Sequence, residues 1–151
     1  FHMREVYARL KLHFEPQAFD KGLGLDFVGG RHAVRTDPLM FERILRNLIA
    51  NAIRYTERGR VMVACRRRGE RLWIQVWDTG IGIAEEHIEA IFDEYFQVGN
   101  PQRDRARGLG LGLSIVKRLA KTLGCEVGCR SRPGKGSVFE FRVPLATETA
   151  S

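Results

Sequence analysis

The segment Val76-Trp77-Asp78-Thr79-Gly80-Ile81-Gly82-Ile83 joins an alternating strand to a turn that contains two glycines. The strand has one apolar face, because successive side chains of a strand point to opposite sides. This face carries Leu72, Ile74 and Val76. The same alternation places Asp78 on the apolar face, where a carboxylate without a partner costs several kcal/mol. The segment therefore predicts either a ligand pocket, with Gly80 and Gly82 allowing close approach of the backbone, or an aspartate that only caps a turn.

The composition is typical of a single soluble domain. A chain of 151 residues can bury its own core, and 44% hydrophobic and 28% charged residues are ordinary proportions for a globular protein. No apolar run approaches the roughly 18 residues of a membrane-spanning helix. The cysteines Cys65, Cys125 and Cys129 lack metal-ligand spacing, so they are predicted to be small core residues in a reducing, cytoplasmic compartment.

The chain carries a formal net charge of +7, which suits a polyanion such as nucleic acid or a phosphorylated ligand. Its densest cationic run, Arg66-Arg67-Arg68, precedes a Gly69-Glu70 turn. A solvated hairpin end explains this run better than a nucleic-acid surface does. We therefore expect no nucleic-acid partner.

The segment after Asp37 predicts a long helix with two distinct faces. Asp37 suits an N-cap, and Pro38 suits the first helical turn. Apolar residues recur every three or four positions and form a stripe for the core, namely Phe41, Ile44, Leu45, Leu48, Ile49, Ala52 and Ile53. A second, polar stripe consists of Asn47, Asn51, Arg54 and Tyr55. Asparagine is a weak helix former, so this stripe indicates coordination of metal and phosphate, although solvated surface residues would explain it equally well.

The remaining chain predicts short elements around these two segments. Residues 4–21 repeat apolar side chains four apart, which predicts a helix with a break or kink at Pro16. The other expected elements are short strands at 25–28 and 33–35, a hairpin of 60–68 and 71–78, a helix at 85–92 with His87 exposed, and a C-terminal hairpin of 126–131 and 137–143. Ser137 lies on the apolar face of the last strand, so its hydroxyl needs a partner and is expected to line the pocket of Asp78.

A glycine-rich run, Gly108-Leu109-Gly110-Leu111-Gly112-Leu113, leads directly into another predicted helix. Free amides and the positive end of the helix dipole make such a helix start an anion site, and the glycines let phosphate oxygens reach it. The preceding residues 98–107, which end at Arg107, are predicted to form a mobile lid that carries counter-charge. The aromatic cluster 92–96 lies just before this lid, and packing in the core explains it as well as a role beside the lid does.

Together these segments resemble the ordered sequence motifs of sensor histidine kinases. Order and spacing carry the resemblance, through the motifs 47–56 (NLIANAIRYT), 78–83 (DTGIGI), 92–96 (FDEYF) and 108–113 (GLGLGL). Over nearly its whole length the chain is similar to the catalytic, ATP-binding domain of a two-component kinase, in the gyrase, chaperone, kinase and mismatch-repair ATPase superfamily. The resemblance implies an α/β two-layer sandwich, the Bergerat-type ATP-binding fold, in which helices cover one face of a mixed, mostly antiparallel sheet.

The resemblance also implies a role for each site residue. Asp78 would accept a hydrogen bond from the exocyclic amine of adenine, and Asn51 would bind Mg²⁺. Asn47 and Arg54 would contact phosphate or metal, so these two residues and Asn51 are the expected catalytic residues. The remaining expected ATP contacts are Tyr55, Gly80, Gly82, Ile83, Phe96, Arg107, Gly108, Leu109, Gly110, Leu111, Gly112, Leu113 and Ser137.

The resemblance further implies how the chain is divided and what it works with. Residues 4–145 would form the catalytic domain, 146–151 a disordered tail, and 1–3 a remnant of cloning. The family's phosphate-accepting histidine lies in a separate helical dimerisation domain, and none of the four histidines here has that context. The implied partners are that histidine-bearing domain and, downstream, a response regulator receiver domain. We expect the isolated domain to be soluble and monomeric, from a parent kinase in the cytoplasm or at the inner membrane.

Three other functions compete with histidine phosphotransfer. A chaperone-like ATPase of the same superfamily places an acidic residue four positions before the metal asparagine, where it activates water. That position here is Asn47, which cannot take a proton. A serine kinase of the same superfamily fits the aromatic cluster and the long lid less well. A non-catalytic ATP-sensing module would need the same nucleotide residues.

Overall fold

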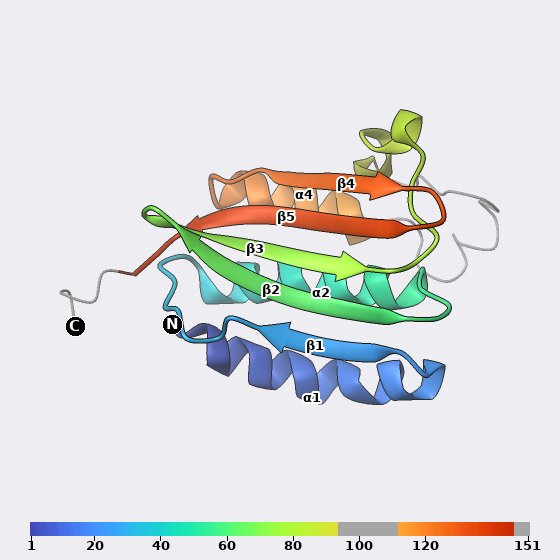
Figure 1. The fold of residues 1–151 in the computed structure, drawn as a ribbon. Coiled ribbons are helices and arrows are strands. Elements are labelled where there is room, and N and C mark those ends of the chain that lie inside the picture. The colour runs from blue at the N-terminus through green and yellow to red at the C-terminus, as the bar shows by residue number, and fades with distance from the viewer. Residues whose placement is uncertain (94–111, 147–151) are drawn as a thin grey trace.

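The computed structural model describes residues 1–93 and 112–146. The elements follow the chain in the order α1 (Met3–Lys21), β1 (Gly24–Val28), α2 (Pro38–Arg54), β2 (Arg60–Arg68), β3 (Arg71–Asp78), the 3₁₀ turns η1 (Glu85–His87) and η2 (Ala90–Phe92), α4 (Gly112–Thr122), β4 (Val127–Arg132) and β5 (Gly136–Pro144). They form two layers, with the sheet on one side and the helices on the other (Figure 1). No helix in the described part of the chain is long and apolar enough to cross a membrane.

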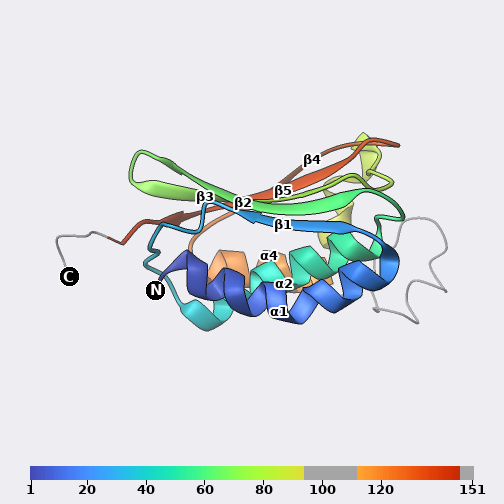
Figure 2. The same ribbon diagram turned by 60° about the horizontal axis from the view of Figure 1, so that its bottom comes forward.

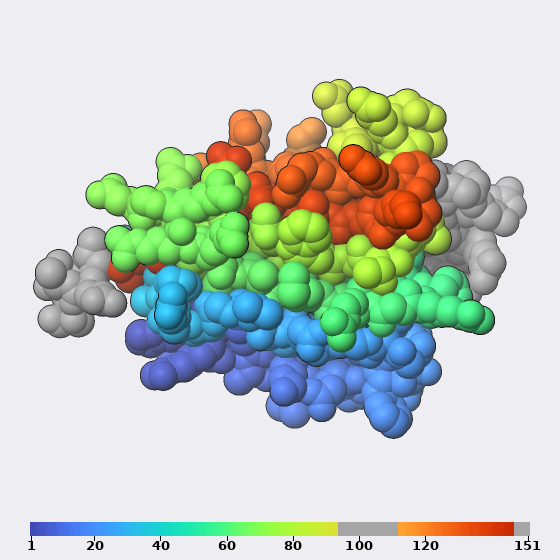
Figure 3. Space-filling model, in the orientation of Figure 1, coloured from blue at the N-terminus to red at the C-terminus, as the bar shows by residue number. Residues whose placement is uncertain are grey.

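The sheet has the strand order β1-β2-β3-β5-β4. β1 runs parallel to β2, and the other neighbouring pairs are antiparallel. The helices α1, α2 and α4 all lie against one face (Figure 2). Figure 3 shows the opposite face, on which the strands form successive bands from β1 in blue to β4 in orange. The expected fold class is therefore confirmed.

The core lies between α2 and the sheet. The apolar stripe of α2 is buried over its whole length, and the inward side chains of β3 are fully buried: Leu72, Ile74 and Val76. Phe41 of α2 meets Phe141 of β5 with ring centroids 5.6 Å apart. Burying one large apolar side chain contributes roughly 1.5–3 kcal/mol. The apolar stripe therefore fixes the rotation of α2 about its axis, and with it the direction of the polar stripe.

The helix α1 runs from Met3 to Lys21 with Pro16 inside it, so of the predicted break or kink the break is wrong. A proline removes one backbone hydrogen bond from a helix. The buried face of α1 nevertheless continues past Pro16 to Ala18 and packs into the common core. Tertiary packing of that face outweighs the loss of a single bond.

Other short elements also differ from the prediction. Residues 33–35 form no strand and make only isolated bridges. The segment 85–92 forms η1 and η2 instead of one helix, because so short a helix has little stability of its own. His87, expected to be exposed, is half-buried. Cys65 is buried, but the other two cysteines are only half-buried, so the prediction of core cysteines holds in part.

Residues 1–3 pack into the fold. Met3 is fully buried, and the ring of Phe1 lies 5.2 Å from that of Phe41. The amino group of Phe1 donates a hydrogen bond to the Val34 carbonyl at 3.0 Å. This packing does not test where these residues come from, so their assignment to cloning stays a prediction. The tail stays a prediction too, because only Ala146 of it is described.

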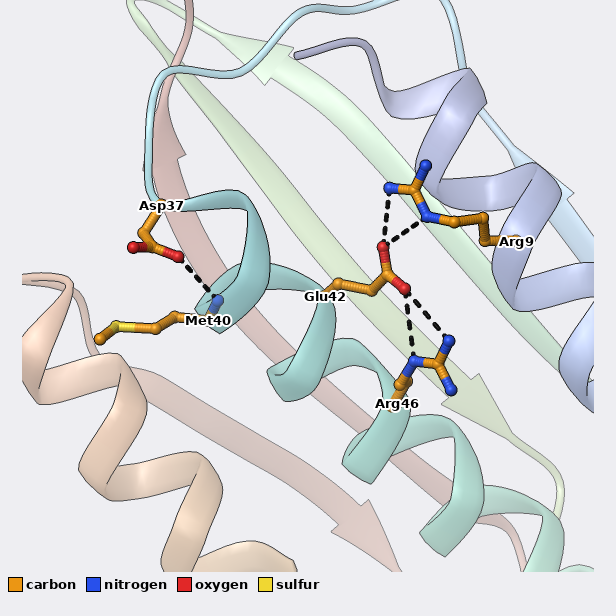
Figure 4. Close-up of polar contacts among 5 residues, drawn as sticks. All are labelled: Arg9, Asp37, Met40, Glu42 and Arg46. Atoms are coloured by element: carbon orange, nitrogen blue, oxygen red, sulfur yellow. Dashed lines mark hydrogen bonds and ion pairs between the residues drawn. The ribbon is translucent and has the colours of Figure 1, made fainter.

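Glu42 of α2 joins α1 to α2 through two arginines (Figure 4). Its Oε1 accepts a hydrogen bond from Arg9 Nε at 2.8 Å, and its Oε2 accepts one from Arg46 Nη2 at 3.2 Å. Burial by itself raises the pKa of Glu42, but the hydrogen bonds from both arginines outweigh burial and lower it. At the start of the same helix, Asp37 Oδ1 accepts from the Met40 N–H at 2.9 Å (Figure 4), which confirms the predicted N-cap.

Glu42→Gln should lower the free energy of unfolding at neutral pH by about 1–2 kcal/mol, because the neutral amide loses charge-assisted hydrogen bonds. Since the pKa of Glu42 is lowered in the folded state, its contribution is present above the ordinary pKa and is lost as the pH falls through the folded value. Urea denaturation over a range of pH measures both effects. The free energies of unfolding of wild type and variant should converge in acid. A constant difference between them down to about pH 3 would contradict the role given to the Glu42 carboxylate.

Candidate functional site

Asp78 ends β3 on the inward face, as the alternation of the strand predicts. It pairs with Val61 of β2 on one side and with Ser137 of β5 on the other. The side chain is half-buried, and Oδ1 accepts a hydrogen bond from the Gly80 N–H at 2.9 Å. Burial raises the pKa of Asp78, while backbone hydrogen bonds from Gly80 and Ser137 offset part of that rise. A carboxylate held in this way keeps acceptor capacity for a donor on a ligand.

The turn after β3 packs against the end of α2. The Ile81 N–H donates to the Tyr55 carbonyl at 3.2 Å. A Cβ on Gly80 would overlap the same carbonyl oxygen and would stand 2.9 Å from Thr56 Oγ1. Thr56 is fully buried, and its hydroxyl donates to the Ala52 carbonyl at 2.7 Å. Close packing against α2 therefore requires a glycine at position 80.

The other side of the turn packs against the β4–β5 hairpin. Gly82 has a left-handed φ of 74°, and a Cβ there would overlap the Arg132 carbonyl oxygen. Nearby, the Gly134 N–H donates to the Ile81 carbonyl at 2.7 Å. The turn is thus clamped between α2 and the hairpin. Both glycines are needed for approach to the protein's own backbone, and their approach to a ligand stays a prediction.

Ser131 of β4 is a residue of the site that sequence reasoning missed. Its hydroxyl accepts from the Ile83 N–H at 2.7 Å, and it lies 2.8 Å from the Gly136 carbonyl oxygen. It also lies 2.7 Å from the hydroxyl of the buried Ser137. The partner expected for the Ser137 hydroxyl is therefore Ser131. The one signal in the sequence is the position of Ser131 on the inward face of β4, two residues after Cys129.

Apolar groups lie beside these polar contacts. Cys129 has its pKa raised to about 12, first by burial and then by the negative charge of Asp78. Phe92 of η2 meets Phe139 of β5 edge-on, with ring centroids 6.1 Å apart. The inner end of the site therefore has a low local dielectric constant, which strengthens any hydrogen bond that Asp78 makes.

The polar stripe of α2 lies beside the start of α4. All of its residues are half-buried, namely Asn47, Asn51, Arg54 and Tyr55. Asn47 Nδ2 donates to the Arg43 carbonyl at 3.0 Å, which leaves Oδ1 as an acceptor. A Cβ on Gly112, the first residue of α4, would stand 3.8 Å from that oxygen. Neither Asn51 nor Arg54 uses its side chain in a hydrogen bond or ion pair with another described residue.

These groups suit a ligand with a donor at one end and an anion at the other. The stripe and the first turn of α4 offer amide oxygens, a guanidinium and helix-terminal amides, which together favour phosphate and a hard metal ion. Within the described ranges, no group of three or more His, Cys, Asp or Glu side chains could hold a metal. A metal here would therefore rely on an asparagine oxygen, water and ligand oxygens, which fits Mg²⁺.

Several predicted contacts lie outside the described residues: Phe96, Arg107, Gly108, Leu109, Gly110 and Leu111. The predicted lid at 98–107 lies there as well. Of the glycine-rich run, Gly112 and Leu113 are described, and both are half-buried at the start of α4.

Comparison with known proteins identifies the chain. Residues 36–147 match the family described as histidine kinase-, DNA gyrase B- and HSP90-like ATPase. The chain belongs to this ATPase family. It is 35% identical over 148 residues to the sensor histidine kinase RcsC of Escherichia coli (strain K12), and 40% identical over 153 residues to the sensor histidine kinase AruS of Pseudomonas aeruginosa. These alignments cover 96% and 98% of this ATPase domain but only 16% and 14% of the relatives.

Solved structures agree with this assignment. The nucleotide-free catalytic domain of the histidine kinase ThkA matches the ATPase domain with a TM-score of 0.82 and 27% identity, over 95% of this chain and 93% of that one. Full-length ShkA in complex with AMPPNP matches with a TM-score of 0.85 and 29% identity, over 97% of this chain and 31% of that one. The fold is that of a histidine kinase catalytic domain.

Gly82→Ala should destabilise the ATPase domain more than Gly134→Ala does. Both glycines have a left-handed φ, 74° and 79°, so both substitutions carry the roughly 1–2 kcal/mol cost of that conformation. Only the Cβ at position 82 meets a backbone carbonyl, whereas no described atom lies within 4 Å of one at position 134. Urea denaturation of the two variants measures the difference. Equal losses would show that the clamp at Gly82 is absent.

Proposed function

We propose that this domain binds Mg-ATP and transfers the γ-phosphoryl group to a histidine on a separate dimerisation domain, in two-component signal transduction. The observation that carries the proposal is the half-buried carboxylate of Asp78, fixed by Gly80 and Ser137. The turn after Asp78 contacts Tyr55 at the end of α2. Tyr55 is the last residue of the polar stripe, so the stripe leads along α2 away from Asp78. ATP has a hydrogen-bond donor on its base and a polyanion at its other end. The base would meet Asp78, and the phosphates would meet the polar stripe.

Asp78 selects adenine. Its remaining acceptor capacity receives the exocyclic amine of adenine, whereas guanine would place a carbonyl oxygen there. Two facing acceptors repel each other, so discrimination comes from the unfavourable pair as well as from the favourable one. Tyr55, Ile83 and Ser137 line the base, and their positions beside the glycine turn support this role.

The polar stripe of α2 and the start of α4 hold the triphosphate. The amide oxygen of Asn51 would hold Mg²⁺, and the bound ion would supply neutralisation of phosphate charge. Arg54 and Asn47 contact phosphate oxygens. The positive end of the α4 helix dipole, which begins at Gly112, stabilises the same negative charge.

Asn47 favours transfer over hydrolysis. In hydrolytic members of the superfamily, an acidic residue stands four positions before the metal asparagine. Asn47 Nδ2 is engaged with the Arg43 carbonyl, and a carboxamide cannot accept a proton from water. Catalysis then rests on holding ATP in line with an incoming histidine, while Arg54 and the helix start offset the charge of the transferring group.

The relatives support the classes of partner. RcsC and AruS are far longer than this chain, and ThkA has been solved in complex with the response regulator TrrA. We infer that the domain acts on a histidine-bearing dimerisation domain of its parent kinase, in the cytoplasm. A response regulator receiver domain then takes the phosphoryl group from that histidine.

Asp78→Asn should weaken ATP binding by about 1–3 kcal/mol, because the base then loses its ionised acceptor. The pKa of Asp78 is raised by burial, so the affinity of the wild type should fall as the pH drops through that raised value. This loss should begin above the ordinary aspartate pKa of about 3.9. Calorimetric titration with ATP at several pH values measures it, and the variant should lack this step.

A nucleotide control separates base recognition from general damage. The amide oxygen of an asparagine at position 78 can still accept from the Gly80 N–H, so the turn should survive the substitution. Wild type should bind ATP more tightly than GTP, and Asp78→Asn should narrow that difference. Equal affinity of the wild type for both nucleotides would refute the role of Asp78.

Phosphotransfer is tested with labelled ATP. Alone, the domain should hydrolyse little ATP and should carry no stable phosphohistidine. A helical hairpin that bears the acceptor histidine should gain acid-labile, base-stable label in the presence of Mg²⁺. Asn51→Ala should remove the gain in ATP affinity that Mg²⁺ gives, because it deletes the amide oxygen. Rapid ATP hydrolysis at a rate that does not change when the hairpin is added would favour a chaperone-like ATPase instead.

A further inference from the structure

A second hollow lies far from the Asp78 site. It is a groove of about 530 Å³, lined by Gly29, Gly30, Arg31, His32, Cys65, Arg66 and Arg67. β2 runs from Val61, opposite Asp78, toward this groove. At about 3.3 Å per residue, the four positions from Val61 to Cys65 span roughly 13 Å. The groove is therefore separate from the proposed nucleotide site.

The groove exists because β1 stops before β2 does. β1 ends at Val28, which pairs with Ala64. β2 continues to Arg68, and beyond Ala64 its one strand partner among the described residues is β3. In Figure 1 the β2–β3 hairpin extends to the left past the end of the β1 arrow. Among the described residues, one edge of β2 is consequently open over its last positions.

Arg67 presents its backbone to this open edge. The N–H and C=O of one residue point to the same side of a strand, and that side alternates along the chain. A Cβ on Gly29 would overlap the Cys65 carbonyl oxygen, so the backbone of Cys65 faces the side of β1. Arg67, two residues later, faces the same side. Its N–H and C=O therefore point away from β3, and no described residue outside the sheet ladders pairs with them.

The lining of the groove is cationic. Arg31 and Arg66 are exposed, and neither side chain makes an ion pair or hydrogen bond with another described residue. Arg67 donates only its Nε, to the Gly69 carbonyl at 3.0 Å. Among the described residues, no carboxylate lines the groove. Burial and the charges of Arg31 and Arg67 lower the pKa of His32, so the arginines carry the charge at neutral pH.

We propose that this groove binds an extended acidic segment of a partner protein, which adds to the edge of β2 as a short strand. The N–H and C=O of Arg67 pair with its backbone, and its carboxylates pair with Arg31 and Arg66. Strand addition of this kind draws affinity from the main chain and specificity from side chains. A small oxyanion would satisfy the arginines but would leave the backbone of Arg67 unpaired.

Charge decides which strand the edge accepts. Charged residues on an edge strand normally prevent pairing with another chain. A second copy of this protein, with its formal net charge of +7, is repelled by Arg31, Arg66 and Arg67. The same charges attract an acidic strand. The edge is therefore protected against self-association and open to an acidic partner.

The probe is a fluorescein-labelled peptide of about six residues in which Glu alternates with Val. Fluorescence anisotropy should show binding to the intact chain. Arg31→Glu and Arg66→Glu should each weaken it by about tenfold or more. Arg130→Glu is the matched control, since Arg130 is exposed on β4, at the opposite edge of the sheet, and should leave affinity unchanged. Hydrogen exchange at the Arg67 amide should slow when the peptide binds.

Two further probes test the mode of binding. The same peptide with N-methylated backbone amides keeps its charge but cannot pair as a strand, so it should bind more weakly than the parent peptide. Inorganic triphosphate should displace the parent peptide only at much higher concentration. Three results would each overturn the proposal. They are a loss of peptide affinity in Arg130→Glu as large as in the other two variants, binding of the N-methylated peptide as tight as that of the parent, and hydrogen exchange at the Arg67 amide that does not slow with peptide. ATP affinity should be unchanged in all three variants, so failure here leaves the proposed function untouched.

Discussion

The half-buried carboxylate of Asp78 is the constraint on which the site depends. Burial raises its pKa, and only nearby donors offset that cost. One donor is the Gly80 N–H, so the chain must fold back immediately after β3. That tight turn survives because α2 contacts one side of it and the β4–β5 hairpin the other. The ends of three distant segments are therefore fixed by the need to satisfy one carboxylate.

α2 links the core to the chemistry of the site. Its apolar and polar stripes share one helical period, so burial of Phe41 and its neighbours determines where Asn47 and Asn51 point. The start of the helix is set by the Asp37 cap, and Glu42 ties it to α1 through Arg9. None of these contacts touches the proposed nucleotide site. They nevertheless position its phosphate end, because a rigid helix transmits their placement over its length.

Features that depend on neighbouring residues could be predicted from the sequence, and features that depend on strand order could not. The inward position of Asp78 and the Asp37 cap follow from local periodicity and capping chemistry. The contact of Ser131 with Ile83 joins residues 48 positions apart and requires β4 to lie beside β5. The break predicted at Pro16 is wrong because tertiary packing outweighs a local propensity. The lid and most of the glycine-rich run lie outside the described residues, so their roles stay predictions.

The two ends of the sheet differ in how their polar backbone is satisfied. Beside Asp78, the backbone of the glycine turn pairs with Tyr55 and Gly134, so the fold itself supplies the partners. Beyond the end of β1, the backbone of Arg67 faces the open edge of β2, where no described residue pairs with it. Exchanging a hydrogen bond to water for one to a peptide yields only about 1 kcal/mol net, which is too little to recruit a partner. Binding at this edge therefore depends on the charges of Arg31 and Arg66, whereas binding beside Asp78 depends on groups already held in place.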